Sequence, residues 1–133
     1  KLLLQKPVSE EILIPVFVFS KGLGALEAVC KYLKENLGFS YTKIASLINR
    51  DQRTVWVSYS NASKKMESCF DIKKPGILIP VSVIANRKFS VLEGVVLYLK
   101  DKDMSHAKIA SLLNRSRQNI LAIHWRARKK YAK

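Results

Sequence analysis

Metal ligands and reactive side chains are scarce in this chain of 133 residues. Its two cysteines, Cys30 and Cys69, and its two histidines, His106 and His124, have spacings that fit neither a disulfide framework nor a zinc site. The sequence also places no paired carboxylates, no nucleophile motif and no glycine-rich phosphate loop for catalysis. We therefore expect free thiols, no metal or other cofactor, no small-molecule substrate and no enzymatic activity.

Long apolar runs are also missing. No stretch approaches the ~20 residues that are needed to cross a bilayer, and Lys1–Lys6 lacks the apolar core of a secretory signal. The chain begins with Lys1 rather than Met, which suggests a processed chain or a piece of a longer protein. Together with the cysteine usage, these features predict a cytoplasmic location and no membrane partner.

Negative charge is the third scarcity. The 24 Lys and Arg against 10 Asp and Glu give a formal net charge of +14 and a pI near 10.0. The hydrophobic fraction of 48% is nevertheless typical of globular proteins, so the chain should fold. Such an excess of positive charge predicts a polyanionic partner, and most of it falls in residues 71–133.

The sequence also contains a duplication. The segment Ile12–Val16 recurs unchanged as Ile77–Val81. Two further blocks return in the same order, and the length differences fall between blocks, where loops tolerate them. The repeated blocks are Leu26–Lys34 with Leu92–Lys100, and Lys43–Arg50 with Lys108–Arg115. We therefore divide the chain into a first module (1–65), a linker (66–76) and a second module (77–133).

Each module has the periodicity of three helices. Apolar residues at helical spacing predict a first helix from about Ala25 to Leu37. Ser40 is expected to cap a short second helix and Asp51 a third, with Asn49 in the left-handed turn between them. The corresponding residues of the second module are Ser105, Ser116 and Asn114. Two short helices joined by a tight turn after a longer helix form a helix-turn-helix.

The stretch Ser40–Val55, SYTKIASLINRDQRTV, resembles a known helix-turn-helix. Similar motifs occur in the C-terminal promoter-reading domain of bacterial sigma factors and in the output domain of quorum-sensing-type response regulators. Those families have a Ser-x-x-Glu-Ile-Ala second helix and a Ser-capped third helix that carries Thr-Val. The resemblance covers about Leu23–Lys65 and again Phe89–Lys130, and it implies binding to duplex DNA in a prokaryotic-type cell.

The chain departs from the family pattern at two places in both copies, and the second copy also has Asn119-Ile120 in place of Thr-Val. The family usually has Gly where this chain has Asn49 and Asn114. It has an aliphatic residue where this chain has Arg50 and Arg115. The family domain is also single, whereas this chain carries two. The resemblance therefore implies a fold without implying which bases are read.

An apolar arm precedes each module and is not part of the family pattern. The arms Ile12–Phe19 and Ile77–Ile84 are rich in β-branched residues and predict buried extended segments. Pro15 and Pro80 argue against a central strand position. Either each arm packs on its own helices, or the arms pair as a ribbon that joins the modules or two chains as a homodimer. The predicted fold class is mainly all-α, with two tandem three-helix modules and arms able to form a small β-ribbon.

The start of the third helix reads base edges in a helix-turn-helix. In the first module Gln52 and Arg53 are the candidates, because Arg can pair with guanine and Gln with adenine, and Thr54 is a weaker one. The second module offers Arg117, Gln118 and Asn119 at these places. The residues expected to contact phosphates are Lys43, Arg50, Lys64, Lys65, Lys108, Arg115, Arg126, Arg128, Lys129 and Lys130.

Some side chains allow more than one interpretation. Trp56 and Trp125 are included with the DNA-contacting residues, although core packing or a protein interface is favoured for them. His124 is interpreted as a core histidine whose hydrogen bonds are satisfied. Phe70 and Ile72 of the linker could pack on either module.

The main prediction is double-stranded DNA binding by the two modules, as a transcription regulator or a nucleoid-associated protein. One alternative is a protein-docking module of a transcription or DNA-processing complex, for which the first copy with Trp56 and Val57 is the better candidate. Another alternative is RNA binding through the basic tail Arg126–Lys133.

Overall fold

The computed structural model describes residues 11–74 and 76–132, so residues 1–10, Pro75 of the linker and Lys133 of the tail lie outside the described residues. The described chain is mainly helical with one small sheet, which confirms the predicted fold class. The first copy consists of β1 (Leu13–Pro15), η2 (Val16–Ser20), α1 (Ala25–Lys31), η3 (Tyr32–Asn36), α2 (Tyr41–Ile48) and α3 (Gln52–Lys65). The second copy consists of β2 (Leu78–Pro80), α4 (Val81–Ala85), α5 (Val91–Asp101), α6 (His106–Leu113) and α7 (Arg117–Tyr131).

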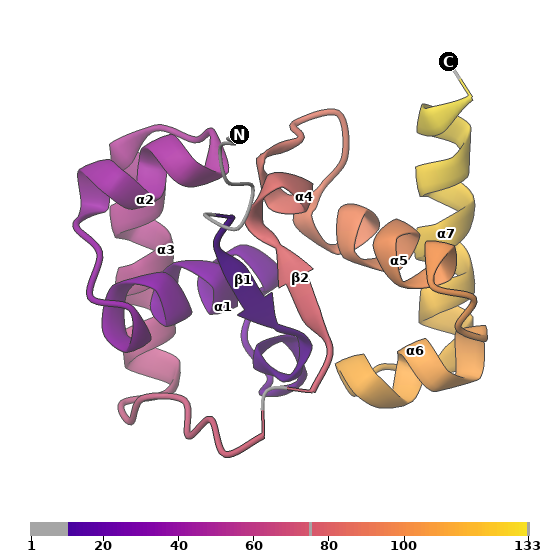
Figure 1. Ribbon diagram of the computed structural model, residues 1–133, viewed down its shortest axis with the longest axis horizontal. Helices are drawn as coiled ribbons and strands as arrows, with labels where there is room; N and C mark the ends of the chain where they lie inside the picture. The colour runs from indigo at the N-terminus through magenta and orange to yellow at the C-terminus, as the bar shows by residue number, and fades with distance from the viewer. Residues whose placement is uncertain (1–10, 75, 133) are drawn as a thin grey trace, which may run out of the picture.

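The two arms meet in the middle of the molecule as an antiparallel ribbon of β1 and β2 (Figure 1). The amide of Val16 donates a hydrogen bond to the carbonyl of Ile77 at 2.9 Å. In the same way the amide of Val81 donates to the carbonyl of Ile12 at 2.9 Å. These equivalent bonds give the ribbon a local twofold symmetry. The ribbon joins the two modules within one chain, as one of the two alternatives predicted, and the arms also contact the helices of their own copies.

Only the first part of each arm is extended, which corrects the prediction of strands over Ile12–Phe19 and Ile77–Ile84. Each strand ends at a proline, and the chain then turns into the short helices η2 and α4. Pro15 (φ −63°, ψ 133°) and Pro80 (φ −64°, ψ 140°) stand immediately before these helices. The amides of Val16 and Val81, directly after the prolines, make the last bonds between the two strands, and the residues that follow them form their hydrogen bonds locally in the short helices.

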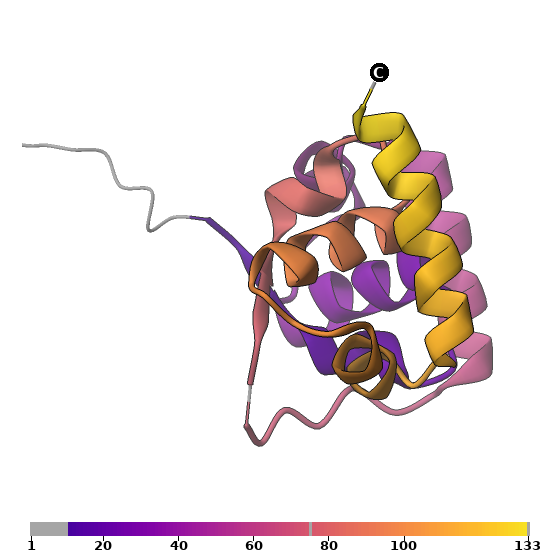
Figure 2. The ribbon, with the colours of Figure 1, turned by 90° about the vertical axis from the view of Figure 1, so that its right-hand side faces the viewer.

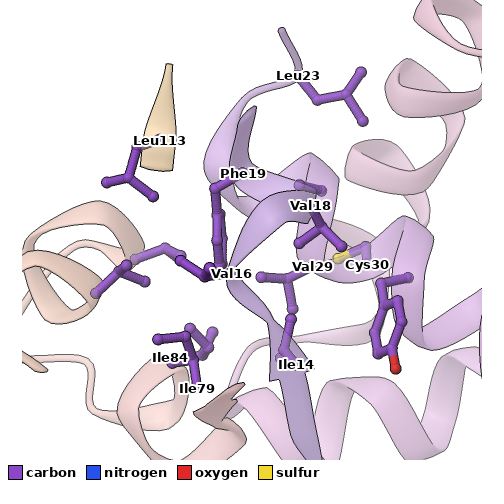
Figure 3. Packing of buried hydrophobic residues seen from close by; sticks show 14 of the residues in the cluster. Ile14, Val16, Val18, Phe19, Leu23, Val29, Cys30, Ile79, Ile84 and Leu113 are labelled. Carbon is purple, nitrogen blue, oxygen red and sulfur yellow. The ribbon is translucent and has the colours of Figure 1, made fainter. Parts of the chain in front are cut away.

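The helical part of each arm packs against both modules. η2 contacts α1 of its own copy and α6 of the second copy, and α4 contacts α5 of its own copy and α2 of the first. The buried side chains of the two copies consequently form one continuous cluster. Figure 3 shows members of this cluster from both arms and from α6, among them Phe19, Ile79, Ile84 and Leu113.

The helices lie in layers behind the ribbon. In Figure 2 the ribbon and arms lie on one side, α1 and α5 in the middle, and α3 and α7 together on the opposite side. Figure 1 shows that α3 and α7 run in opposite directions, since α3 descends from α2 whereas α7 rises toward the C-terminus. The third helices of both copies thus lie on one face, related by the same approximate twofold symmetry as the ribbon.

The predicted caps and turns are confirmed in both copies. The Ser40 hydroxyl accepts the Lys43 amide at 3.1 Å, and the Asp51 carboxylate accepts the Thr54 amide at 2.8 Å. Between them Asn49 has the left-handed conformation, with a φ of 56°. The same roles belong to Ser105, Ser116 and Asn114 in the second copy. Local side-chain chemistry therefore fixes where the helices of each helix-turn-helix begin and end.

The linker packs on the first copy. Phe70 is 3% exposed and meets the ring of Phe17 edge-on, with ring centroids 6.2 Å apart. Its carbonyl accepts a hydrogen bond from the Asn36 side chain at 3.0 Å. The chain that leaves α3 is therefore held against the first arm before it reaches β2.

Candidate nucleic-acid interface

The amino-terminal ends of α3 and α7 carry the exposed side chains that a helix-turn-helix would present to base edges. Gln52 and Arg53 are exposed at the start of α3, and Arg117 and Gln118 are exposed at the start of α7. These residues occupy the first two positions of each helix, directly after the capping residue. Both ends therefore offer one Arg and one Gln, but in opposite order.

The third residue of each helix is less available than predicted. Thr54 is half-buried, and its amide donates a hydrogen bond to the Asp51 carboxylate at 2.8 Å. Asn119 is also half-buried, and its side-chain oxygen is buried with no hydrogen-bond partner among the described residues. Both third residues are therefore less exposed than the two residues before them. The most accessible candidates for base contact are the two Arg–Gln pairs.

The charge at the amino-terminal ends of α3 and α7 differs. The hydrogen bond from the Thr54 backbone amide is the main cause that lowers the pKa of Asp51, so this carboxylate is ionised at neutral pH. Ser116 occupies the same position in the second copy and carries no charge. An anion that approaches the start of α3 meets a negative charge, whereas one that approaches the start of α7 does not. The second copy is therefore the better electrostatic match for a phosphate backbone.

Half of the predicted phosphate contacts are exposed and outside any ion pair that the described residues form. These are Lys43, Lys64, Lys108, Arg128 and Lys129. The ammonium of Lys129 lies 4.5 Å from the ring centroid of Trp125, and that of Lys43 lies 4.1 Å from the ring centroid of Phe39. Contact with an aromatic face orients these cations without neutralising them.

Three other predicted phosphate contacts form internal ion pairs instead. Lys130 lies 2.7 Å and Arg126 lies 3.7 Å from the Glu93 carboxylate, which is 4% exposed as a residue. Lys65 makes the matching contact to Glu27 at 2.9 Å in the first copy. Burial alone would raise the pKa of Glu93, but the bonds from Lys130 and from the backbone amide at the helix start lower it overall. These contacts tie the end of the third helix to the start of the first.

Arg50 has a different role from the phosphate contact that we expected. Its guanidinium is half-buried and donates from Nη1 to the carbonyls of Ile48 and Ile84, both at 2.7 Å. Ile84 belongs to the arm of the other copy. Arg115 is half-buried too and lines a hollow together with Phe19 of the first arm. Both arginines thus lie where one module meets the other, and we leave them out of the DNA-contacting set.

The two tryptophans lie on the surface, which excludes core packing for Trp56 and Trp125, and a protein interface stays a prediction for them. Trp56 is 54% exposed on α3, where Val57 is 43% exposed, and Trp125 is 62% exposed on α7. Each outward helix face therefore has polar and basic residues at its start, apolar residues in its middle and basic residues toward its end.

A histidine pair joins α6 to α7 in the second copy. Nε2 of His106 lies 2.9 Å from Nδ1 of His124, and both rings are half-buried. At the same places the first copy has Tyr41 and Tyr59, whose ring centroids are 6.0 Å apart. The bond satisfies His124 as predicted, although the residue is less buried than a core position. The sequence did not lead us to predict this pair. Both histidines align with tyrosines of the first copy, which was the available signal that the two positions are related.

Both histidines have a lowered pKa. For His106 burial is the main cause, followed by the nearby charges of Lys100 and Arg117. For His124 burial again comes first, followed by His106, Lys100 and Arg128. A lowered pKa favours the neutral form of both rings, in which one ring donates its N–H to the unprotonated nitrogen of the other. Together with Trp125 the pair lines an open hollow of about 540 Å³ on the outward side of α7.

The buried cysteine does not have the character of a reactive site. Cys30 is buried, and burial raises the pKa of its thiol to about 12. Cys69 is exposed in the linker and forms no disulfide. A nucleophilic thiol needs a lowered pKa, so the buried Cys30 is chemically inert.

No protein-family model, curated protein or solved structure matches this chain. None of the helices in the described ranges combines the length and the apolar character required to pass through a membrane. What the arrangement offers chemically is a pair of Arg–Gln ends on one face, flanked by exposed cations. Those groups can donate hydrogen bonds to base edges and neutralise phosphates.

Proposed function

We propose that the protein binds double-stranded DNA as a single-chain pseudo-dimer, with α3 and α7 as its two reading helices. The observation that carries this proposal is that both helices lie on one face in opposite directions, each with an exposed Arg–Gln pair at its start (Figures 1 and 2). Dimeric helix-turn-helix proteins use this arrangement to read two half-sites about one helical turn, roughly 34 Å, apart. The duplex would lie across α3 and α7, on the side away from the ribbon.

Specific contacts would come from the two Arg–Gln pairs. Arg pairs bidentately with guanine and Gln with adenine, and each good pair discriminates against a wrong base by about 1–3 kcal/mol. Because Gln52-Arg53 becomes Arg117-Gln118 in the second copy, the two helices present these groups in opposite order. We therefore expect two related but non-identical half-sites in inverted orientation rather than a perfect palindrome.

Non-specific affinity would come from the exposed cations near both reading ends. Lys43 and Lys108 lie on the second helices, while Lys64, Arg128 and Lys129 lie toward the ends of the third helices. If all of them contact phosphates, the logarithm of affinity falls with the logarithm of salt concentration with a slope of about −4 to −5. The uncharged Ser116 cap makes the second copy the stronger clamp on the backbone.

A selection from random duplexes followed by affinity measurements at several salt concentrations tests the proposal. A bipartite motif whose affinity exceeds that of random duplex supports a sequence-specific transcription regulator. Equal affinity for all sequences with a steep salt dependence supports a nucleoid-associated role instead. Absence of duplex binding at low salt refutes DNA binding altogether.

Protein docking is the second candidate, because Trp56 and Val57 are exposed side by side on α3. If α3 docks on a protein, Trp56→Ala and Arg53→Ala both leave DNA affinity unchanged, and only α7 contributes to it. If α3 reads DNA, Arg53→Ala changes base preference. RNA binding through the tail is less well supported, because Arg126 and Lys130 are paired with Glu93. Competition by RNA of equal charge tests it.

A further inference from the structure

The turn of each helix-turn-helix donates side-chain hydrogen bonds to the end of the arm of the other copy. The side-chain amide of Asn49 donates to the carbonyl of Ala85 at 3.3 Å. By the equivalent contact, the amide of Asn114 donates to the carbonyl of Ser20 at 3.3 Å. Arg50 adds its bond to the Ile84 carbonyl at 2.7 Å. We call this set of contacts the clasp.

The clasp supplies hydrogen bonds that the arms cannot make alone. Ser20 ends η2 and Ala85 ends α4, and the last carbonyls of a helix have no partner within it. The chain supplies donors to them from Asn49 and Asn114, whose left-handed backbone is compatible with a side-chain amide. A Gly in this turn has no side chain, and an aliphatic residue after it has no donor. The donors of the clasp are therefore the side chains of Asn49, Arg50 and Asn114.

The clasp adjoins the reading ends in sequence. Asn49 and Arg50 are followed by the Asp51 cap and then by Gln52 and Arg53. A second bond runs in the opposite direction, because the guanidinium of Arg87 in the second copy donates to the Asn49 carbonyl at 3.1 Å. A turn that is held from both sides fixes where α3 begins relative to the second copy. The packing of α2 on α4 and of α6 on η2 supports the same placement with buried apolar side chains.

We infer that Asn49, Arg50 and Asn114 are positioning residues that fix the distance between the two reading ends, and that the protein therefore accepts two half-sites at only one spacing. This inference rests on the proposed function. The residues touch no base in this scheme and act through the helices that follow them. A shift of one base pair moves a half-site by about 3.4 Å and rotates it by about a tenth of a turn, which a rigid pair of reading ends cannot follow.

The test uses variants that remove only the clasp. Asn49→Gly and Asn114→Gly delete the amide but keep a residue that favours positive φ. Arg50→Leu deletes the guanidinium and keeps an apolar stem. Lys74→Leu, in the exposed linker, is the matched control for loss of one positive charge. Each protein is titrated with duplexes in which the two selected half-sites are separated by spacers that differ by single base pairs, and with a duplex that carries one half-site.

The wild type and Lys74→Leu should lose about tenfold in affinity or more for a spacer one base pair from the optimum. The double Asn→Gly variant and Arg50→Leu should lose less than about threefold, while their affinity for a single half-site stays at the wild-type value. A sharp spacing preference that survives in these variants overturns the inference and leaves the proposed function intact. If Arg50→Leu does not fold, the double Asn→Gly variant carries the test.

A second measurement does not depend on DNA. Spin labels at Asn61→Cys on α3 and Ala122→Cys on α7, in a Cys69→Ser background, report the distribution of distances between the reading helices. All three positions are exposed. The distribution should be narrow with the clasp intact and at least twofold broader in the double Asn→Gly variant. An unchanged narrow distribution overturns the inference, and absence of duplex binding with a clasp-dependent distribution refutes only the proposed function.

Discussion

Replacing Ile79 by alanine should destabilise both copies although Ile79 lies in the arm of only one. Its side chain is 0% exposed and lies opposite Ile14 in the ribbon. Removing three carbons loses about 0.8 kcal/mol each, or about 2.4 kcal/mol. A cavity that does not fully collapse adds about 1 kcal/mol or more. We expect the free energy of unfolding to fall by about 3–4 kcal/mol, a large part of the stability of a domain of this size.

Urea unfolding followed by circular dichroism measures this loss, and hydrogen exchange of the α1 and α5 amides shows where it acts. Because the buried cluster is continuous across the ribbon, protection should fall by the same free energy in both helices. Leu13→Ala is the control, since Leu13 belongs to the same ribbon but is 42% exposed, and its cost should stay below about 1 kcal/mol. Loss of protection in α5 with wild-type protection in α1 would refute the shared core.

Three further predictions concern charges. Glu93→Ala should lower the free energy of unfolding by about 2 kcal/mol, measured by urea unfolding, because it removes a capping box and the partner of two cations. The lowered pKa values of His106 and His124 mean that their contribution to stability is complete above about pH 6.5 and is lost as the pH falls through their lower folded-state values. Exchanging both for tyrosine, as in the first copy, should remove the part of the acid sensitivity of the urea midpoint that appears above pH 5. In DNA titrations Arg53→Ala should alter base preference at one position, whereas Lys129→Ala should weaken all duplexes alike and reduce the salt slope by about one.

The helices and turns could be predicted because they depend on local chemistry. Ser40 and Asp51 cap helices through bonds to amides three residues away, and Asn49 ends a helix through its own backbone conformation. Such signals are present in a short window of sequence. Each of these signals occurs once in each copy, and this repetition predicts the division into two modules.

The contact of each arm with the module of the other copy could not be predicted. The segments that form the ribbon, Ile12–Val16 and Ile77–Val81, are identical and do not distinguish the two modules. The helical parts that follow, Val16–Ser20 and Val81–Ala85, differ in sequence, but their apolar residues do not indicate which helices they contact. The role of Arg50 depends on this contact between copies, since its acceptor, the Ile84 carbonyl, is 34 residues away in sequence. Without this acceptor, a basic residue in a helix-turn-helix predicts a phosphate contact.

Fluorescence anisotropy with three labelled duplexes of equal length tests DNA binding most directly. One duplex carries both selected half-sites, one carries a single half-site and one is scrambled, and each is titrated between about 50 and 200 mM salt. The two-site duplex should bind at least about 100-fold more tightly than the single-site duplex, because the second contact is intramolecular. All three affinities should fall as salt rises. Equal affinities for the three duplexes would contradict reading by two helices, and no binding at the lowest salt would contradict DNA binding itself.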